Sequence, residues 1–509
     1  MELKRKRRPL NKTSKIFSCF LFALYTVLTL MEVFCHEPWQ DELHTWVLAR
    51  ELNVFQIIYW MRYDGHFALW HLILHPFAAS GFPLVTLNLV AWALCIVGTW
   101  LFFFRTRLPL WVRGLLLFSF PLFFYYPVVA RPYCLVPLAL YFLTELYPVR
   151  LRHPFRYSFA VLLVLYIHSY LAGLAGMLGL FFLFDLIRHY RRMSDPLRLK
   201  RIVLPPALML IGALAAFLMV IPAVGESTVV PGTFGEFFGR NLLRGIGEAL
   251  TDLPAGQHAM LLSGWIGSPA VNVLYWLATL TGLAVLWKTN RQMFCIWSGA
   301  MVWMLTMSAL VFPMLLHRGY LPYLFLVFSL GLTLPRKVRK DPPKRLLAAG
   351  YVSIALLSVM TFPVSWKIFQ LEIKHPFSNQ GQMAAFIEQN VPSSAKIVTF
   401  PAELISSTLT AFLPDHRFYQ CETNQRYTVF KGKGKIPAVL NDAVLHYYSE
   451  GNQCFYLVLT ARLIGFYRLT PEKLAHGFRH FQVEFLYRTE PEAFFPAGED
   501  YYIFKVTPR

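Results

Sequence analysis

The sequence predicts a polytopic α-helical membrane protein, with about eleven transmembrane helices followed by a C-terminal extracytoplasmic α/β domain. Three observations predict this fold class: an unusually apolar composition, a recurrence of apolar runs long enough to span a bilayer, and a one-sided distribution of basic residues between those runs. Hydrophobic residues account for 56% of the 509 positions, which is more than the core of a soluble protein requires.

The apolar runs fill the first three quarters of the chain, so we assign residues 1–366 to a transmembrane domain. A hydrocarbon layer of ~30 Å is crossed by ~20 helical residues, and a few of the runs are shorter than this. The predicted spans lie near residues 16–35, 84–104, 110–128, 132–148, 155–169, 170–187, 203–222, 270–288, 292–312, 319–335 and 346–365.

Basic residues indicate which side of the membrane each connection faces. Of the 48 Lys and Arg, only six lie in one set of alternate connections, and 27 lie in the other set, at residues 1–15, 105–113, 149–157, 188–201, 288–291 and 336–345. This positive-inside pattern predicts a cytoplasmic N-terminus in a plasma membrane, or in the inner membrane of a Gram-negative cell. An odd number of spans then places residues 367–509, the C-terminal domain, on the outer side.

The net charge of +20 therefore reports membrane orientation rather than an anionic partner. Beyond residue 366, 15 basic residues are nearly balanced by 13 acidic ones. No domain has the one-sided basic face that nucleic-acid binding needs. We therefore expect membrane lipids, and no nucleic acid, among the partners.

Two predicted outer loops are too long to be simple connectors. Residues 36–82 contain several tryptophans, which suit the membrane interface, and we expect two short helices along the membrane surface, the first after Pro38 and the second near His66. Residues 223–264 contain apolar side chains at helical spacing, which predicts a further interfacial helix.

The C-terminal domain differs in character from the rest of the chain, because its apolar runs are of strand length and alternate with helix-like stretches. Cys421 and Cys454 fall in this outer domain, where they either form a disulfide or remain thiols. The strand candidates are residues 395–400, 454–459, 481–487 and 501–506, and the helix candidates are residues 379–390 and 436–449.

Asp41 and Glu42 form an adjacent acid pair directly outside the first predicted span. Acids at the start of a helix also stabilise the helix dipole, which is the purely structural alternative. At the membrane surface, however, a carboxylate can meet both a lipid-linked substrate and a hydroxyl or amine acceptor, and can take the acceptor's proton as a general base. We assign that role to Asp41, with Glu42 beside it.

Histidines accompany this acid pair. His44 lies one helical turn from Asp41 and could orient its carboxylate, while Asp64, His66 and His71 surround a glycine that permits a tight turn. These side chains either make structural hydrogen bonds or belong to the site. A divalent metal ion could be held loosely among them, although a reaction in which phosphate leaves needs no metal.

Fixed cations are expected near a leaving phosphate. Arg131 and Arg318 each lie at the outer end of a predicted span, two residues ahead of Tyr133 and Tyr320 respectively. An arginine fork matches phosphate with two parallel hydrogen bonds, whereas the structural alternative is an anchor that reaches lipid headgroups. His168, at the outer turn between the fifth and sixth predicted spans, is a further candidate for the same pocket.

Four motifs in this chain resemble those of the GT-C superfamily of glycosyltransferases. The likeness is greatest to glycosyltransferase family 39, which includes bacterial membrane proteins related to protein O-mannosyltransferases and aminoarabinose transferases. In two places the chain departs from the family pattern: Val129 replaces the acid of the family's EARPYAL element, and Gly319 is inserted into its RYLLP element. The motifs are PWQDELHTWVLARE from residue 38, YDGHFALWH from residue 63, ARPYCL from residue 130 and RGYLPYLF from residue 318.

The resemblance, which extends over residues 1–340, implies a polyprenyl-phosphate or dolichyl-phosphate monosaccharide donor and inversion at the anomeric carbon. It also implies that Asp41 is the catalytic base. It does not imply an acceptor, because related enzymes modify lipids, polysaccharides or proteins. The predicted function is therefore transfer of a monosaccharide from a lipid phosphate to an acceptor on the outer side of the membrane.

A transporter or flippase for lipids or lipid-linked sugars is the main alternative. Such proteins usually show repeated halves and ionisable residues at the bilayer midplane. Here the ionisable residues cluster at the outer surface, and the predicted spans show no repeat. An inactive scaffold that presents the outer domain to partners is a third alternative, and altering Asp41 would leave its function intact.

Overall fold

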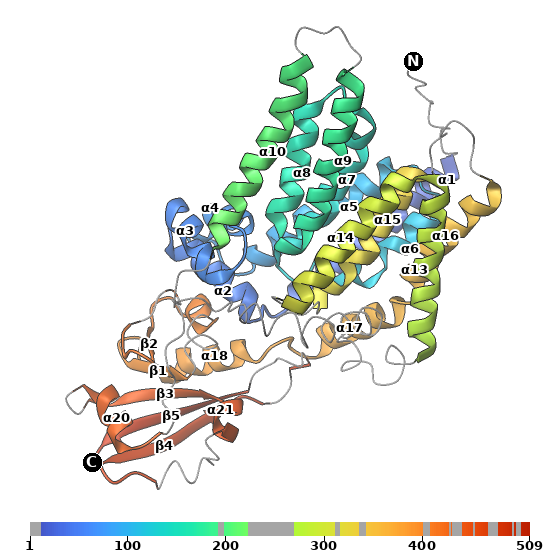
Figure 1. Cartoon of the computed structure of the whole chain (residues 1–509). Helices are drawn as coiled ribbons and strands as arrows, with labels where there is room; N and C mark the ends of the chain where they lie inside the picture. The colour runs from blue at the N-terminus through green and yellow to red at the C-terminus, as the bar shows by residue number, and fades with distance from the viewer. Residues whose placement is uncertain are drawn as a thin grey trace.

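The chain folds into a bundle of long helices with a small sheet at one end (Figure 1). The computed structural model describes residues 12–191, 198–221, 269–310, 316–334, 343–400, 408–426, 429, 440–450, 453–466, 477–490, 493–494 and 500–509. Within these residues, seven helical segments are long and apolar enough to cross a membrane, namely Lys12–Cys35, Thr86–Arg105, Pro132–Val149, Ser169–Tyr190, Leu199–Val220, Ala270–Thr289 and Lys344–Lys374. The chain is therefore a helical membrane protein.

The remaining predicted spans are not among these seven segments. Residues 110–128 form two short pieces, α6 (Leu110–Leu117) and the π-helix η1 (Pro121–Tyr125). The helices α8 (Pro154–Ile167) and α15 (Leu321–Thr333) have 14 and 13 residues, and α14 (Arg291–Leu310) has 20. The figure of about eleven spans thus stays a prediction. The helix expected in residues 223–264 lies outside the described residues.

The break between α6 and η1 leaves backbone groups that no longer bond within a helix. The Phe120 N–H donates to Thr361 Oγ1 at 3.0 Å, and the Phe118 carbonyl accepts from Ser365 Oγ at 3.0 Å. Both partners lie where α16 (Lys344–Val359) meets α17 (Phe362–Lys374). Side chains at the junction of α16 and α17 therefore provide hydrogen bonds for the backbone groups at the break. Such partners are needed within a bilayer, where water is absent.

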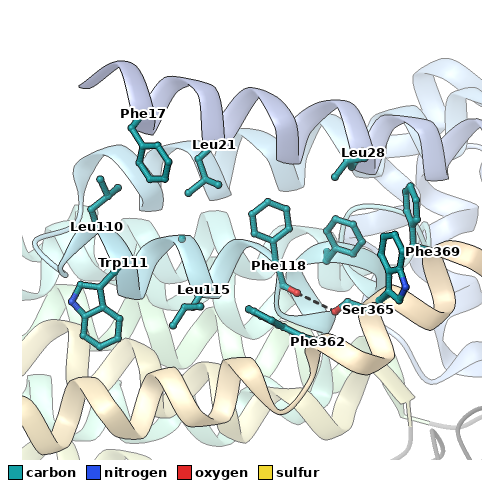
Figure 2. A pocket seen from close by; sticks show the side chains of 13 residues that line it. Phe17, Leu21, Leu28, Leu110, Trp111, Leu115, Phe118, Phe362, Ser365 and Phe369 are labelled. Carbon is teal, nitrogen blue, oxygen red and sulfur yellow. Dashed lines mark hydrogen bonds between the residues drawn. The ribbon is translucent and has the colours of Figure 1, made fainter. Parts of the chain in front are cut away.

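An apolar groove of about 590 Å³ runs between α1 (Lys12–Cys35), α6 and α17 (Phe362–Lys374) (Figure 2). Trp111 and Trp366 line it and are 53% and 61% exposed. The groove therefore opens on the lipid-facing surface. Because its lining is almost entirely apolar, we expect hydrocarbon chains rather than water to fill it.

The C-terminal domain contains a five-stranded mixed sheet, with strand order β2-β1-β3-β5-β4. β1 pairs in parallel with both β2 and β3, while β5 pairs antiparallel with β3 and β4. The four predicted strands are confirmed, and β2 was not predicted. The strands are β1 (Lys396–Phe400), β2 (Arg417–Gln420), β3 (Phe455–Thr460), β4 (Phe481–Arg488) and β5 (Tyr501–Pro508).

Helices pack against both faces of this sheet, as the predicted α/β architecture requires. α18 (Gln380–Asn390) contributes Met383 and Ile387 to the core on one face. α20 (Asp442–Ser449) contributes Leu445 and Tyr448 to the core on the other face. Among the described residues, no disulfide joins Cys421, which is buried, to Cys454, which is exposed.

Close packing of α5 (Thr86–Arg105) on α7 (Val136–Leu146) gives the first testable prediction. A Cβ atom at Gly98 would lie 2.7 Å from the Leu138 Cα, so Gly98→Ala must push the two helices apart. Overpacking of this kind costs about 1–3 kcal/mol, and we expect a lower thermal midpoint in detergent. Gly176→Ala is the matched control, because no atom lies within 4 Å of its added Cβ. Equal midpoints for the two variants would contradict the packing of α5 on α7.

Candidate functional site

The N-terminus of α2 (Gln40–Glu51) is built around the buried carboxylate of Glu42. Glu42 Oε2 accepts from the Trp39 N–H at 3.1 Å and lies 3.0 Å from His36 Nε2. Its other oxygen, Oε1, accepts from Asn88 Nδ2 at 3.0 Å and from the Ala130 N–H at 2.6 Å. Glu42 therefore holds together the chain before α2, the helix α5 and the turn that precedes Arg131.

Asp41 points in a different direction and keeps 35% of its side chain exposed. Its Oδ2 lies 3.1 Å from Nη1 of Arg131, whose side chain is only 6% exposed. Val129, at the position where the similar GT-C element has an acid, is buried and apolar. The acid that pairs with Arg131 is therefore supplied by α2. Glu42 fixes both partners, because it is adjacent to Asp41 in the sequence and accepts from the N–H of Ala130, the residue before Arg131.

A second group of ionisable side chains surrounds Asp64 at the end of α3 (Val54–Asp64). Gly65 ends this helix in the left-handed conformation, with φ 70°, which glycine adopts without strain. Three histidine nitrogens then lie near the Asp64 carboxylate: His66 at 3.5 Å, His71 at 3.7 Å and His44 at 3.9 Å. The α2 and α3 clusters predicted from the sequence therefore meet in one place.

Burial and charge determine the protonation of this group. Burial raises the pKa of Asp64, but the three histidines and Arg131 outweigh it and lower that pKa to about 2. Burial lowers the pKa of His66, and it lowers the pKa of His71 to about 3. At neutral pH, Asp64 is therefore an anion and His71 is a neutral imidazole.

Arg131 connects the two clusters. Its Nη2 lies 3.3 Å from His66 Nε2, and His66 Nδ1 lies 2.9 Å from the Asp64 carbonyl. A guanidinium can only donate, so Nε2 accepts and the proton of the neutral imidazole lies on Nδ1. That tautomer is assigned from the hydrogen bonds on either side of the ring. Arg131 thus contacts Asp41 and His66 at the same time.

Aromatic rings and a second arginine border the cluster. The His168 ring lies 5.1 Å from His66 and 4.9 Å from Tyr133. Arg318 lies 5.9 Å above the Tyr170 ring and near the Tyr133 side chain. Both Arg131 and Arg318 interact electrostatically with Tyr133. The two predicted cations therefore converge on one tyrosine.

Tyr320 is the predicted site residue that lies elsewhere. Its ring packs 5.6 Å from Phe120 and 6.0 Å from Tyr125 in the aromatic core around η1. Residues two apart in a 3₁₀ turn point in different directions, so Arg318 and Tyr320 in η7 (Leu316–Tyr320) separate. The residues brought together are Asp41, His44, Asp64, His66, Arg131, Tyr133, His168 and Arg318, with Glu42 buried behind them.

Three residues of this arrangement were not predicted from the sequence. His36 binds Glu42 on one side and Glu372 on the other, and Asn88 binds Glu42 from α5. Asn88 carries a weak signal, because it is a lone amide near the start of an apolar run. Glu372 carries no such sequence signal, since an acid at this position is typical of the exposed face of an amphipathic helix.

The described residues contain no group of three His, Cys, Asp or Glu side chains that could hold a metal ion. The histidines around Asp64 lie at distances typical of charge interactions rather than of a shared ligand sphere.

No model of a known protein family matches this sequence, and no curated protein is similar to it. The likeness to the GT-C glycosyltransferases therefore depends on the four motifs alone.

The buried, neutral His71 gives a prediction of pH dependence. Neither of its ring nitrogens has a hydrogen-bond partner among the described residues. Between about pH 3 and 6.5 the unfolded chain binds a proton at this position that the folded chain does not, so stability falls as the pH is lowered. His71→Gln removes this contribution of about 1.4 kcal/mol per pH unit.

Thermal midpoints at pH 7, 6 and 5 measure the effect. We expect the midpoint of the wild type to fall more steeply than that of His71→Gln. The exposed His446 provides the matched control, His446→Gln, which should keep the wild-type slope. Parallel curves for His71→Gln and the wild type would contradict the neutral, buried state of His71.

Proposed function

We propose that this chain is an integral-membrane glycosyltransferase that moves a monosaccharide from a polyprenyl phosphate to an acceptor on the outer side of the membrane. One observation carries the proposal: the partly exposed Asp41 carboxylate lies against the buried Arg131, with Arg318 and a group of histidines beside them. Such a site offers a proton acceptor and fixed cations together, as transfer from a lipid phosphate requires.

The reaction is a direct displacement. The acceptor oxygen or nitrogen attacks the anomeric carbon while the bond from that carbon to the phosphate oxygen breaks, and the configuration inverts. The acceptor's proton passes to Asp41, and the electron pair of the broken bond leaves with the polyprenyl phosphate. Asp41 is suited to the proton transfer because it is ion-paired yet 35% exposed, so that an acceptor can reach it.

The negative charge on the phosphate grows as the bond breaks, so cations that contact it stabilise the transition state more than the bound donor. Arg131 is held by Asp41 through Nη1 and by His66 through Nη2, which fixes the plane of its guanidinium. Arg318 approaches the same region from η7. We assign donor phosphate binding to these two arginines, with His168 and Tyr133 as supporting contacts.

Glu42 has a different role from its neighbour. It is 0% exposed, and its two oxygens already accept or share four hydrogen bonds. Substrate therefore cannot reach it without disrupting the fold. We assign Glu42 to positioning Asp41 and Arg131 rather than to proton transfer.

A flippase is the second candidate, because the bundle opens a lipid-facing groove. The ionisable cluster favours the transferase. It gathers residues from α2, from the end of α3 and from the chain before α7, beside the C-terminal domain rather than midway along the long helices (Figure 1).

Loss of the base provides the main test. Asp41→Asn keeps the shape of the side chain but cannot take a proton at neutral pH, so we expect transfer to slow at least ~100-fold. Purified protein would be assayed with a panel of radiolabelled polyprenyl-phosphate sugars for transfer and for donor hydrolysis. Donor binding should change little.

Glu51→Gln is the control, because Glu51 lies at the exposed end of the same helix and, among the described residues, pairs with its neighbour Arg50 alone. Full activity in Asp41→Asn would exclude Asp41 as the base. If no donor is turned over by the wild type while labelled lipid crosses vesicle membranes, the protein is a flippase.

The proposal also fixes the orientation of the chain. Cys454 is exposed on the C-terminal domain, and the charge pattern places that domain outside. A membrane-impermeant maleimide should therefore label intact cells that express the wild type, and Cys454→Ser should lose the labelling that the exposed Cys35 at the outer end of α1 does not account for. Adding Arg107→Cys to Cys454→Ser places a thiol in an exposed, inward connection, which should label only after permeabilisation. The reverse pattern would overturn the orientation.

A further inference from the structure

The helix α17 reaches the candidate site through one buried histidine. Glu372 Oε1 lies 2.9 Å from His36 Nδ1, and His36 Nε2 lies 3.0 Å from Glu42 Oε2. All three side chains have no exposed area. Because Glu42 also accepts from the Ala130 N–H, an unbroken series of hydrogen bonds joins α17 to the turn that carries Arg131.

The partners of His36 are acids on both sides, and an ionised carboxylate only accepts hydrogen bonds. Both bonds therefore form when the ring carries two N–H groups. Burial lowers the pKa of His36, but Glu372 and Glu42 outweigh it and raise that pKa to about 10. Glu32 on α1 and the adjacent Glu37 also face the ring and interact with it electrostatically.

The chain around His36 is also enclosed by the segment that follows α17. Glu37 Oε1 accepts from Ser378 Oγ at 2.8 Å and from the Gly381 N–H at 2.8 Å. The Phe377 ring lies 4.7 Å from the His36 ring. The connection from the last span into the C-terminal domain thus supports the chain that leads into α2.

We propose that Glu372 is a positioning residue of the candidate site: by holding His36 against Glu42, it fixes Asp41 relative to Arg131. The proposal rests on the transferase function given above, in which Asp41 is the base. Glu372 would then support the carboxylate of Asp41, which it does not touch and which lies 331 positions earlier in the chain. Breaking a buried charge network of this kind by removing one partner is disruptive, because the other charges stay buried.

Hydrogen exchange of backbone amides tests the proposal without any assay of activity. The Trp39 and Ala130 N–H groups both donate to Glu42, so they report whether Glu42 stays in place. In full-length Glu372→Gln we expect both amides to exchange at least ~10-fold faster than in the wild type. Glu37→Gln is the matched control: it should speed exchange at Gly381 and leave Ala130 unchanged.

Glu372→Asp keeps the charge and provides the second variant, in case Glu372→Gln does not fold. We expect it to restore protection at Ala130 in part. Wild-type protection of Ala130 in both Glu372 variants would overturn the proposal.

Transfer kinetics separate positioning from general stabilisation. In Glu372→Gln we expect kcat to fall ~10- to 100-fold with the donor KM changed less than about threefold, because Asp41 and Arg131 lose their relative positions while Arg318 still binds the donor phosphate. His36 then loses one of the acids that keep it charged, so the remaining activity should decline as the pH rises from 6 to 9. Glu372→Asp should keep the wild-type pH profile.

If the fall in kcat is accompanied by a loss of thermal stability and the pH profile is unchanged, Glu372 only stabilises the fold. If the amides respond as expected but the wild type turns over no donor, the transferase function fails while the support of Glu42 by Glu372 stands.

Discussion

Four hydrogen bonds to one buried carboxylate hold the candidate site of this protein in place. Glu42 has no exposed area, and a charge buried in this way is costly unless its lone pairs are satisfied. Its donors come from His36, Trp39, Asn88 and Ala130. These lie before α2, in α5 and beside Arg131, so each of those segments is fixed relative to the others. Because Glu42 makes these structural hydrogen bonds, the neighbouring Asp41 can pair with Arg131 and remain partly exposed.

Much of the fold could be predicted from the sequence, since membrane spans and strands are both signalled by local apolar patterns. The seven long helices coincide with predicted spans, and four of the five strands were expected. β2 (Arg417–Gln420) was missed because it has four residues, of which only Phe418 is buried. The third crossing was expected as one helix, because composition alone does not report that its hydrogen bonds change at Ser119 and Pro121.

The candidate site was predictable where its residues lie close together in sequence. Asp41 and His44 share a helix, and Asp64, His66 and His71 share a turn, so spacing alone brings each set together. The bond between His36 and Glu372 joins residues 336 positions apart. No local pattern records such a contact, because Glu372 lies between Lys367 and Lys374 as an exposed acid of an amphipathic helix would. Only the packing of α17 against α1 reveals it.

The break in the predicted third span, residues 110–128, also bears on how this protein is made. Its freed backbone groups at Phe118 and Phe120 bond to Ser365 and Thr361, 247 and 241 residues later in the chain. During synthesis these groups enter the bilayer long before their partners exist. We therefore expect the third crossing to stay loosely inserted, or to be shielded by the insertion machinery, until the last span arrives. Biogenesis of the first half of this membrane domain would then be completed only at the end of translation.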